Sequence, residues 1–454
     1  MDIDPEKYPG IAKLLELEQT DNIPEWAESS IARDFAERHK DDLRYVHEWG
    51  KWYRYHEGHW LADKTLYAYG KVRDLCDEIA SRQEDRRVTG VASARGVHAV
   101  TQLARADRTF AATTDHWDAD HLLLNCRTKT IDLRTGAIRD QRAADYITKK
   151  TACDCAPLGT PFPQWDAFLC RVTDHNDDLI GFLQRYIGYC LTGQTHEHVF
   201  VFAHGTGGNG KGTFLNTVSD VLGDYATVAD TGTFIASRWE RHPTDLAHLV
   251  GARLVVAQET QEGRRWNEAL IKQMTGGDTM SARFMRQDYF TFKPTHKLFI
   301  TGNHRPTLST VDPAMRRRLL LVPFTVQIPP DERDPTLREK LVHEWPAILR
   351  WMVAGTLEWQ RAGLQIPPIV REASDQYFAD EDTLGQWLAE RVDVDDTREL
   401  TSSRDLFGDW RTWCDDRGHR PGSQKDFTKK LEDKGLEYKR TKAMRGFYIR
   451  IRRG

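Results

Sequence analysis

The chain has 454 residues, a net charge of −4 and a mean hydropathy of −0.62. Such a length favours several domains over one compact core. No apolar run approaches the roughly 18 residues of a membrane helix, the first residues are acidic unlike a secretory leader, and the seven cysteines lack CxxC spacing. These features exclude a membrane protein and a disulfide scaffold, so we expect a soluble, cytoplasmic protein with no membrane partner.

The N-terminal third is predicted to begin with a polar leader, residues 1–28, followed by a mixed α+β domain, residues 29–160. Apolar spacing indicates helices, and aromatic residues that alternate with polar ones indicate a hairpin. The expected elements are helices at 29–39 and 66–82, a hairpin at 49–60 and short strands at 122–138.

A proline-marked boundary separates this domain from a second one. Residues 161–195 are predicted to form a helical linker region. From 196 to 365, apolar strands alternate with helices, which predicts a mostly parallel sheet flanked by helices. The candidate strands are residues 199–203, 253–257, 297–301 and 319–324.

A glycine-rich turn after the first of these strands is the most informative segment. Its glycines allow successive backbone N–H groups to turn inward around a polyphosphate, and a helix begins directly after it. Lys211 supplies a positive charge for the β and γ phosphates. A glycine-rich hairpin without a ligand is the alternative. The predicted phosphate-binding residues are Gly205, Thr206, Gly207, Gly208, Asn209, Gly210, Lys211, Gly212 and Thr213.

Two positions depart from the Walker consensus. Gly212 stands where a serine or threonine usually binds Mg²⁺, and the nearest hydroxyl is that of Thr213. At the end of the second strand, Gln258 occupies the place of the usual first acid and Glu259 follows it. We predict Glu259 as the catalytic carboxylate, with Thr213 and Glu259 as metal ligands and Glu262 as a substitute. The alternative is that Glu259 is an ordinary exposed acid at the end of a strand, without a catalytic role.

Polar and basic residues near the later strands complete the candidate site. Asn303 follows the third strand, where its amide can orient the attacking water. The arginines at 316–318 precede the fourth strand and can reach the ATP of a neighbouring subunit in a ring, although a solvated basic patch is the alternative. Residues 279–292 are predicted to form a hairpin whose Arg283 or Arg286 grips a phosphodiester backbone.

The last segment, residues 370–454, combines two helices, a hairpin and a basic end. Residues 421–454 contain eleven Lys or Arg against four Asp or Glu, a net charge of +7 that favours an anionic partner. The order helix, helix, hairpin is typical of a winged-helix module, and a small helical cap with an ordinary charged face is the alternative. The expected elements are helices at 404–416 and 424–434 and strands at 437–442 and 446–451.

The ordered motifs of the central segment are GTGGNGKGTF, GARLVVAQETQEG, LIKQMTGGDTMSARF, FKPTHKLFITGNHRP and DPAMRRRLLLVPF. Together they resemble the superfamily 3 helicases, specifically the helicase part of phage and plasmid primase-helicases without the primase domain. The sequences IDLRTG and DYITKKTACDCAP in the N-terminal third are similar to that family's helicase-associated domain. The resemblance extends from about residue 29 to the end of the chain.

The resemblance implies a multidomain α/β chain with an AAA+-like P-loop ATPase core, a mixed α+β N-terminal domain and a C-terminal winged-helix-like DNA-binding domain. It implies an ATP- and Mg²⁺-dependent replicative DNA helicase of a phage, prophage or mobile element in a bacterial host. Such helicases form rings, commonly hexamers, that move along single-stranded DNA and unwind forked duplex.

The same resemblance implies roles for individual positions. The catalytic set is Glu259 for water activation, Asn303 as the polar sensor, and Arg317 or Arg318 as the arginine finger. The DNA-binding set, which would face the central pore, is Lys272, Arg283 and Arg286.

Three other functions compete with this one. Asp118 and Asp120 form a DxD pattern like the metal pair of a primase, but no further Asp or His constellation accompanies it, so a primase or polymerase would be a separate partner chain. For a nucleotide-dependent, ring-forming replication initiator or scaffold, the displaced metal ligands count in favour, whereas the retained Glu259, Asn303 and arginines count against it. A small-molecule kinase would share the loop but would not explain the hairpin, the arginines or the basic end.

Overall fold

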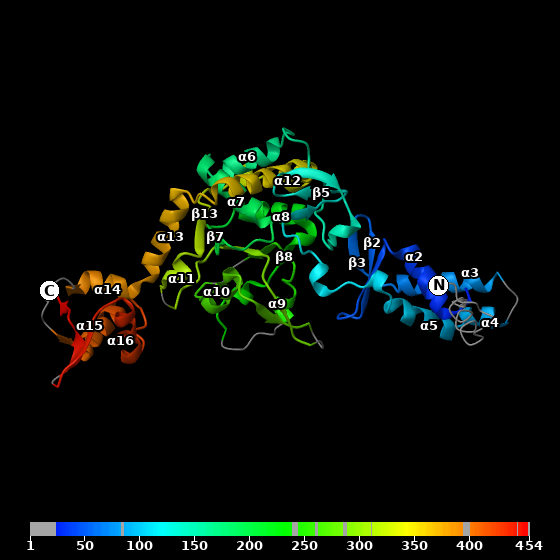
Figure 1. The fold of residues 1–454 in the computed structure, drawn as a ribbon. Helices are drawn as coiled ribbons and strands as arrows, with labels where there is room; N and C mark the ends of the chain where they lie inside the picture. The colour runs from blue at the N-terminus through cyan, green and yellow to red at the C-terminus, as the bar shows by residue number, and fades with distance from the viewer. Residues whose placement is uncertain are drawn as a thin grey trace, which may run out of the picture.

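The computed structural model describes residues 24–82, 86–237, 244–258, 262–284, 288–309, 311–393, 400–442 and 444–452. Glu259 and Arg286, two of the predicted site residues, lie outside the described residues, as does most of the predicted polar leader. Figure 1 shows an N-terminal unit, a central layered unit and a C-terminal unit that follow one another in chain order.

The N-terminal unit packs helices against a small antiparallel sheet of order β1-β2-β3. The predicted hairpin is confirmed, since β2 and β3 turn at Glu57 and Gly58, both with positive φ. Trp52 and Phe110 meet edge to face with ring centroids 5.1 Å apart in its core. Its elements are α2 (Glu28–His39), β1 (Leu43–Val46), β2 (Lys51–His56), β3 (His59–Ala62), α3 (Tyr67–Ala80), α4 (Arg86–Thr89) and α5 (Ala94–Arg105).

The central sheet has the order β13-β7-β12-β9-β8, and every neighbouring pair is parallel. The predicted parallel sheet is therefore confirmed, and each of the four expected strands is present within one residue. The short edge strand β8 was not predicted from the sequence. The strands are β7 (Phe200–His204), β8 (Ala226–Val228), β9 (Leu254–Gln258), β12 (Lys297–Gly302) and β13 (Leu319–Pro323).

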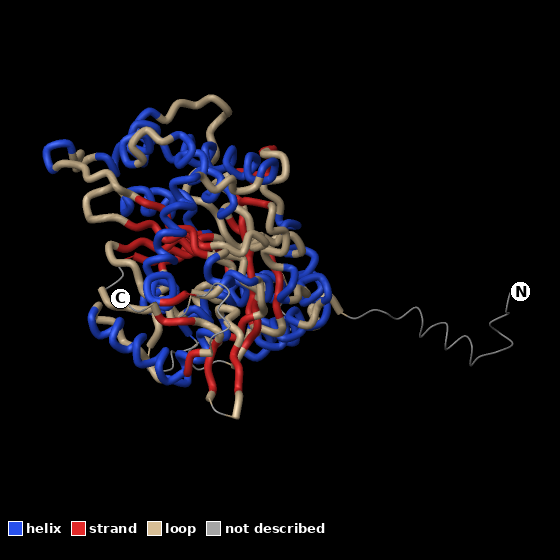
Figure 2. Tube along the Cα trace, turned by 90° about the vertical axis from the view of Figure 1, so that its left-hand side faces the viewer, coloured by secondary structure: helices blue, strands red, loops and turns tan. Residues whose placement is uncertain are grey.

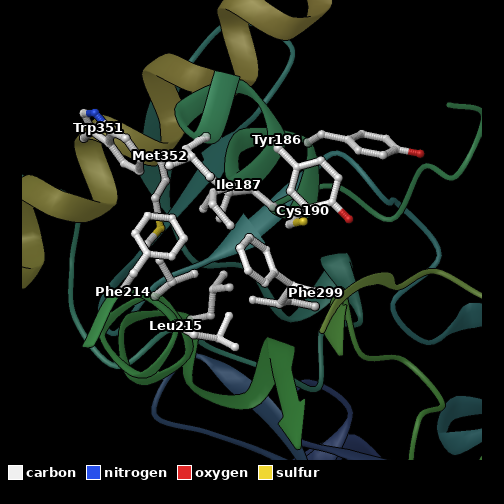
Figure 3. Close-up of a cluster of buried hydrophobic side chains, with 14 of the residues drawn as sticks. Tyr186, Ile187, Cys190, Phe214, Leu215, Phe299, Trp351 and Met352 are labelled. Carbon is white, nitrogen blue, oxygen red and sulfur yellow. The ribbon is translucent and has the colours of Figure 1, made fainter. Parts of the chain in front are cut away.

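Helices cover both faces of this sheet, and Figure 2 shows the strands in red between helices in blue. Figure 3 shows Phe214, Phe299, Tyr186 and Met352 converging between one face of the sheet and its helices. Gly188 lets two of these helices touch, because a Cβ there would lie 2.2 Å from the backbone nitrogen of Thr356. The helices on this face are α6 (Pro163–Val172), α7 (Asp177–Cys190), α8 (Lys211–Leu222) and α12 (Leu337–Ala362).

A second apolar cluster fills the opposite face, where Phe202 and Val255 meet Trp266 and Ile271. The helices and short strands on this side are α9 (Thr244–Ala247), α10 (Glu268–Gly276), β10 (Met280–Ala282), β11 (Phe290–Phe292), α11 (Pro313–Arg316) and α13 (Pro368–Glu381). Helix α13 begins at Pro368. It follows Pro367, and proline is compatible with the first helical position.

Two buried basic side chains join the central sheet to the preceding segments. Arg253 donates hydrogen bonds to the carbonyls of Leu123 and Leu191 at 2.7 and 2.5 Å. The Nζ of Lys297 donates to the carbonyls of Thr192 and Thr295. Leu123 begins a small antiparallel sheet of β4 (Leu123–Asn125), β5 (Lys129–Asp132) and β6 (Ala137–Asp140).

The C-terminal unit has its own core, in which Trp410 stacks on Phe427 at 5.9 Å. The predicted order of two helices and a hairpin is confirmed. Its elements are α14 (Thr383–Arg391), β14 (Val392–Asp393), β15 (Thr401–Ser402), α15 (Ser403–Asp416), α16 (Gln424–Asp433), β16 (Tyr438–Arg440), β17 (Arg445–Phe447) and β18 (Arg450–Ile451). Among the described helices, none has both the length and the apolar character of a membrane span.

Candidate functional site

The glycine-rich loop leaves the carboxyl end of β7, an interior strand, and leads into α8 at Lys211. A Cβ on Gly205 would lie 2.1 Å from the carbonyl oxygen of Phe324, so no other residue fits without a shift. Gly208 and Gly210 have φ values of +78° and +82°, which favour glycine. The loop conformation thus depends on glycine at three positions.

Lys211 is buried, with 8% of its surface exposed. Its ammonium donates to the carbonyl of Gly205 at 2.7 Å, to Oδ1 of Asn209 at 3.0 Å and to Oδ1 of Asn303 at 3.3 Å. Burial lowers the pKa of Lys211. The three oxygen acceptors hold the ammonium at the inner side of the loop.

A cavity of about 320 Å³ lies beside this ammonium. Strand pairing places its walls together, because Thr301 is opposite Gln258 and Gly302 is opposite His204. The carboxyl ends of parallel strands are the usual ligand-binding edge of an α/β sheet. The lining residues are Gly207, Gly208, Asn209, Gly210, Lys211, Gly212, Thr213, Gln258, Thr301, Gly302 and Asn303.

Gln258, at the end of β9, is oriented by a neighbour on α8. Its Nε2 donates to Oδ1 of Asn216 at 3.0 Å, which leaves its amide oxygen as the group available to the cavity. Thr213 also lines the cavity, whereas Glu259 lies outside the described residues. Gly212 is exposed, and a Cβ there would meet no atom within 4 Å. A lack of space therefore does not explain why this position is glycine.

The three consecutive arginines before β13 differ in their contacts. Arg316 pairs with Asp375 at 2.8 Å. Arg318 donates to Oγ1 of Thr275 and to the carbonyl of Ala314 at 3.2 and 2.8 Å. The exposed side chain of Arg317 forms no hydrogen bond or ion pair with any described residue. Of the two residues predicted as arginine fingers, Arg318 is therefore held by hydrogen bonds, whereas the side chain of Arg317 has no such partner among the described residues.

The predicted DNA-binding residues also differ. Lys272 forms an ion pair with Asp312, whose carboxylate in turn caps α11 through the backbone nitrogen of Met315. The guanidinium of Arg283 lies 4.9 Å from the ring centroid of Tyr289 across the β10–β11 hairpin. The hairpin expected at 279–292 is thus present.

Arg333 is a neighbour of the loop that the sequence analysis missed. Its Nε donates to the carbonyl of Ile328 at 3.0 Å, and the Ile328 nitrogen donates to the carbonyl of Gly208 at 2.9 Å. A Cβ on Gly208 would lie 2.5 Å from the Arg333 guanidinium. No local sequence pattern marks this arginine, because only the return of the chain after β13 brings it to the loop.

Asp118 and Asp120 both take part in local hydrogen bonding. Asp118 accepts from the backbone nitrogen of Thr148 at 2.8 Å. Asp120 pairs with Arg134 at 2.8 Å and accepts from the nitrogen of Leu122. These contacts give each carboxylate a role within the N-terminal third.

Two protein families match consecutive parts of the chain. Residues 32–174 match the family described as D5 N terminal like. The N-terminal third of the chain is thus similar to this family. Residues 203–318, which include the loop, Asn303 and the arginine cluster, match a family of unknown function (DUF5906).

Two viral proteins resemble a large part of the chain. "Putative helicase L207/L206" of Acanthamoeba polyphaga mimivirus is 24% identical over 322 residues, which are 65% of this chain and 33% of that protein. "Putative helicase 022R" of Frog virus 3 is 28% identical over 253 residues, 50% of this chain and 26% of that protein. The chain thus spans only a third or less of each relative.

Solved structures share the fold. The apo structure of the NrS-1 C terminal region (305–718) superposes with a TM-score of 0.51 at 8% identity, covering 93% of this chain and 99% of that one. The A form apo structure of the same region gives a TM-score of 0.50 at 9% identity. At these identities the two superpositions show a shared fold.

Proposed function

We propose that the protein is an ATP-dependent replicative DNA helicase of the superfamily 3 type, encoded by a phage, prophage or mobile element. The observation that carries this proposal is the cavity in which Lys211 and Asn303 meet at the ends of parallel strands. The names of the two viral relatives favour a helicase over a small-molecule kinase.

ATP with Mg²⁺ fits the residues of this cavity. The buried ammonium of Lys211 and the N-terminus of α8 suit a polyphosphate. Magnesium usually keeps waters and takes only one or two protein ligands beside the phosphates, so Thr213, Gln258 and Glu259 are sufficient candidates despite the absence of a hydroxyl at Gly212. When bound, MgATP would supply the phosphoryl group whose hydrolysis drives movement.

The chain's own residues then have distinct tasks. Lys211 holds the phosphates, Asn303 orients the attacking water, and Glu259 accepts its proton. Arg317, exposed and unengaged within the described residues, stabilises transition-state charge in the site of an adjacent subunit. This task requires a ring, which we propose to be a homohexamer around single-stranded DNA.

Contact with DNA falls on two basic regions. The β10–β11 hairpin carries Arg283 and, by sequence, Arg286. The C-terminal unit, which we propose to be a winged-helix-like domain, adds the net charge of +7 in residues 421–454. Lys272 already has an acidic partner, so it would support the hairpin segment more than the DNA.

A second candidate is a ring-forming initiator or scaffold that binds nucleotide but turns it over little. Gly212 and Gln258 favour this function, because both usual supports of Mg²⁺ are replaced. Unwinding of a forked duplex separates the two functions. A helicase unwinds the duplex with ATP but not with a non-hydrolysable analogue. Ring assembly without unwinding under either condition would favour the scaffold.

A further inference from the structure

The β10–β11 hairpin has two faces of different character. Its register pairs Met280 with Phe292 and Ala282 with Phe290 on one face, where Met280 and Ala282 are buried. Ser281 lies opposite Thr291 on the other face, and both are exposed. The next position of this exposed face brings Arg283 opposite Tyr289.

The aromatic side chains beyond the last strand pair are not equivalent. Phe284, 38% exposed, stacks on Phe290 with centroids 5.6 Å apart and also meets His248. Tyr289 is 60% exposed, and its ring lies beside the guanidinium of Arg283. Phe284 therefore belongs to the packed face, whereas Tyr289 presents ring surface to solvent.

We propose that Tyr289 and Arg283 form a base-stacking site for single-stranded nucleic acid. An exposed aromatic ring beside a guanidinium offers a π-face to a base and a positive charge to the adjoining phosphate, a combination used for strands of any sequence. Residues 280–293 contain three basic side chains and one acidic one, which suits an anionic strand better than a basic or neutral partner.

This inference rests on the proposed function, since a motor on single-stranded DNA needs contacts that every nucleotide can provide. The stacking site adds recognition of the base, which phosphate contacts do not provide. A site built only from arginines would bind the backbone whether or not bases are attached, whereas a stacking site requires the base.

The test compares two probes with the full-length protein, an oligothymidylate and an abasic oligonucleotide of equal length and charge, by fluorescence anisotropy with a non-hydrolysable ATP analogue. We expect the wild type to bind the oligothymidylate at least about fivefold more tightly than the abasic probe. Tyr289→Ala should remove this difference by weakening only oligothymidylate binding, and Tyr289→Phe should keep it. Circular dichroism checks the fold of each variant.

Arg283→Ala serves as the matched comparison, because loss of its charge should weaken binding of both probes. Equal wild-type affinity for the two probes, or an unchanged preference in Tyr289→Ala, would overturn the stacking site and leave the helicase proposal intact. Failure of the wild type to bind either probe would overturn both the stacking site and the helicase proposal.

Discussion

The ammonium of Lys211 donates a 3.3 Å hydrogen bond to the amide oxygen of Asn303, 92 positions away in the sequence. The bond connects the first turn of α8 with the end of β12, across the cavity edge formed by the sheet. Any anion that displaces this contact would free the Asn303 amide to face the same cavity. In the proposed mechanism, the pair therefore couples the group that binds phosphate to the group that orients water.

Replacing Asn303 should separate binding from turnover. Asn303→Ala leaves Lys211 its two loop acceptors, so nucleotide affinity should change little while ATP turnover falls about a hundredfold. Asn303→Asp places a carboxylate beside the ammonium and should weaken nucleotide binding as well. Fluorescent-nucleotide titration and steady-state hydrolysis measure the two effects. Equal loss of affinity in both variants would argue against a sensor role.

The variant Gly212→Ser should fold normally and should bind Mg²⁺ more tightly during turnover. A Cβ there meets no atom within 4 Å, and exchange of glycine in a helix stabilises by about 0.5 kcal/mol. The new hydroxyl should lower the Mg²⁺ concentration for half-maximal turnover. Gly205→Ala is the contrasting variant, since its Cβ would lie 2.1 Å from the Phe324 carbonyl and should disrupt the loop. An unchanged Mg²⁺ requirement in Gly212→Ser would mean that other groups hold the metal.

The neighbouring arginines should respond differently to truncation. Arg318→Ala loses hydrogen bonds to Thr275 and Ala314 and should lower the free energy of unfolding by about 1–3 kcal/mol. Arg317→Ala should leave thermal stability unchanged but abolish turnover in the assembled protein. Mixing Arg317→Ala with Lys211→Ala subunits should restore part of the activity, because intact arginines and intact loops can then meet. No recovery on mixing would contradict a finger that acts between subunits.

Burial of Lys297 should make stability depend on pH. Desolvation lowers its pKa from 10.5 to about 7, so between these values the unfolded chain holds a proton that the folded chain lacks. The free energy of unfolding of the wild type should therefore rise relative to Lys297→Met, by on the order of 2 kcal/mol between about pH 7 and 9.

Denaturant unfolding of both proteins across this range measures the difference. The surrounding Arg253, Cys190, Tyr189, His296 and His121 are present in both proteins, so the comparison measures Lys297 together with its electrostatic coupling to Cys190, His296 and His121. A difference that stays constant with pH would show that Lys297 remains charged when buried.

Features encoded locally could be predicted from the sequence. The four apolar strands followed from short hydrophobic runs, and the loop followed from glycines whose φ values and close contacts the structure shows. The hairpin at 49–60 followed from alternation of aromatic and polar residues, and the predicted pairing at 279–292 is also confirmed.

Features that depend on distant segments could not be predicted from the sequence. The sheet order that inserts β12 between β7 and β9 brings Asn303 to Lys211, and the chain after β13 brings Arg333 to Gly208. The Lys272–Asp312 pair likewise joins separate helices. Each contact arises from tertiary packing, which residue spacing alone does not specify.

The central claim is that a DNA-coupled ATPase acts in the Lys211–Asn303 cavity. Its most direct test is ATP hydrolysis by the purified protein with and without single-stranded DNA, compared with Glu259→Gln. Turnover that DNA stimulates and that the variant loses while still binding nucleotide is the predicted result. Absence of turnover in the wild type, with nucleotide bound, would contradict the motor and favour a ring that only assembles on DNA.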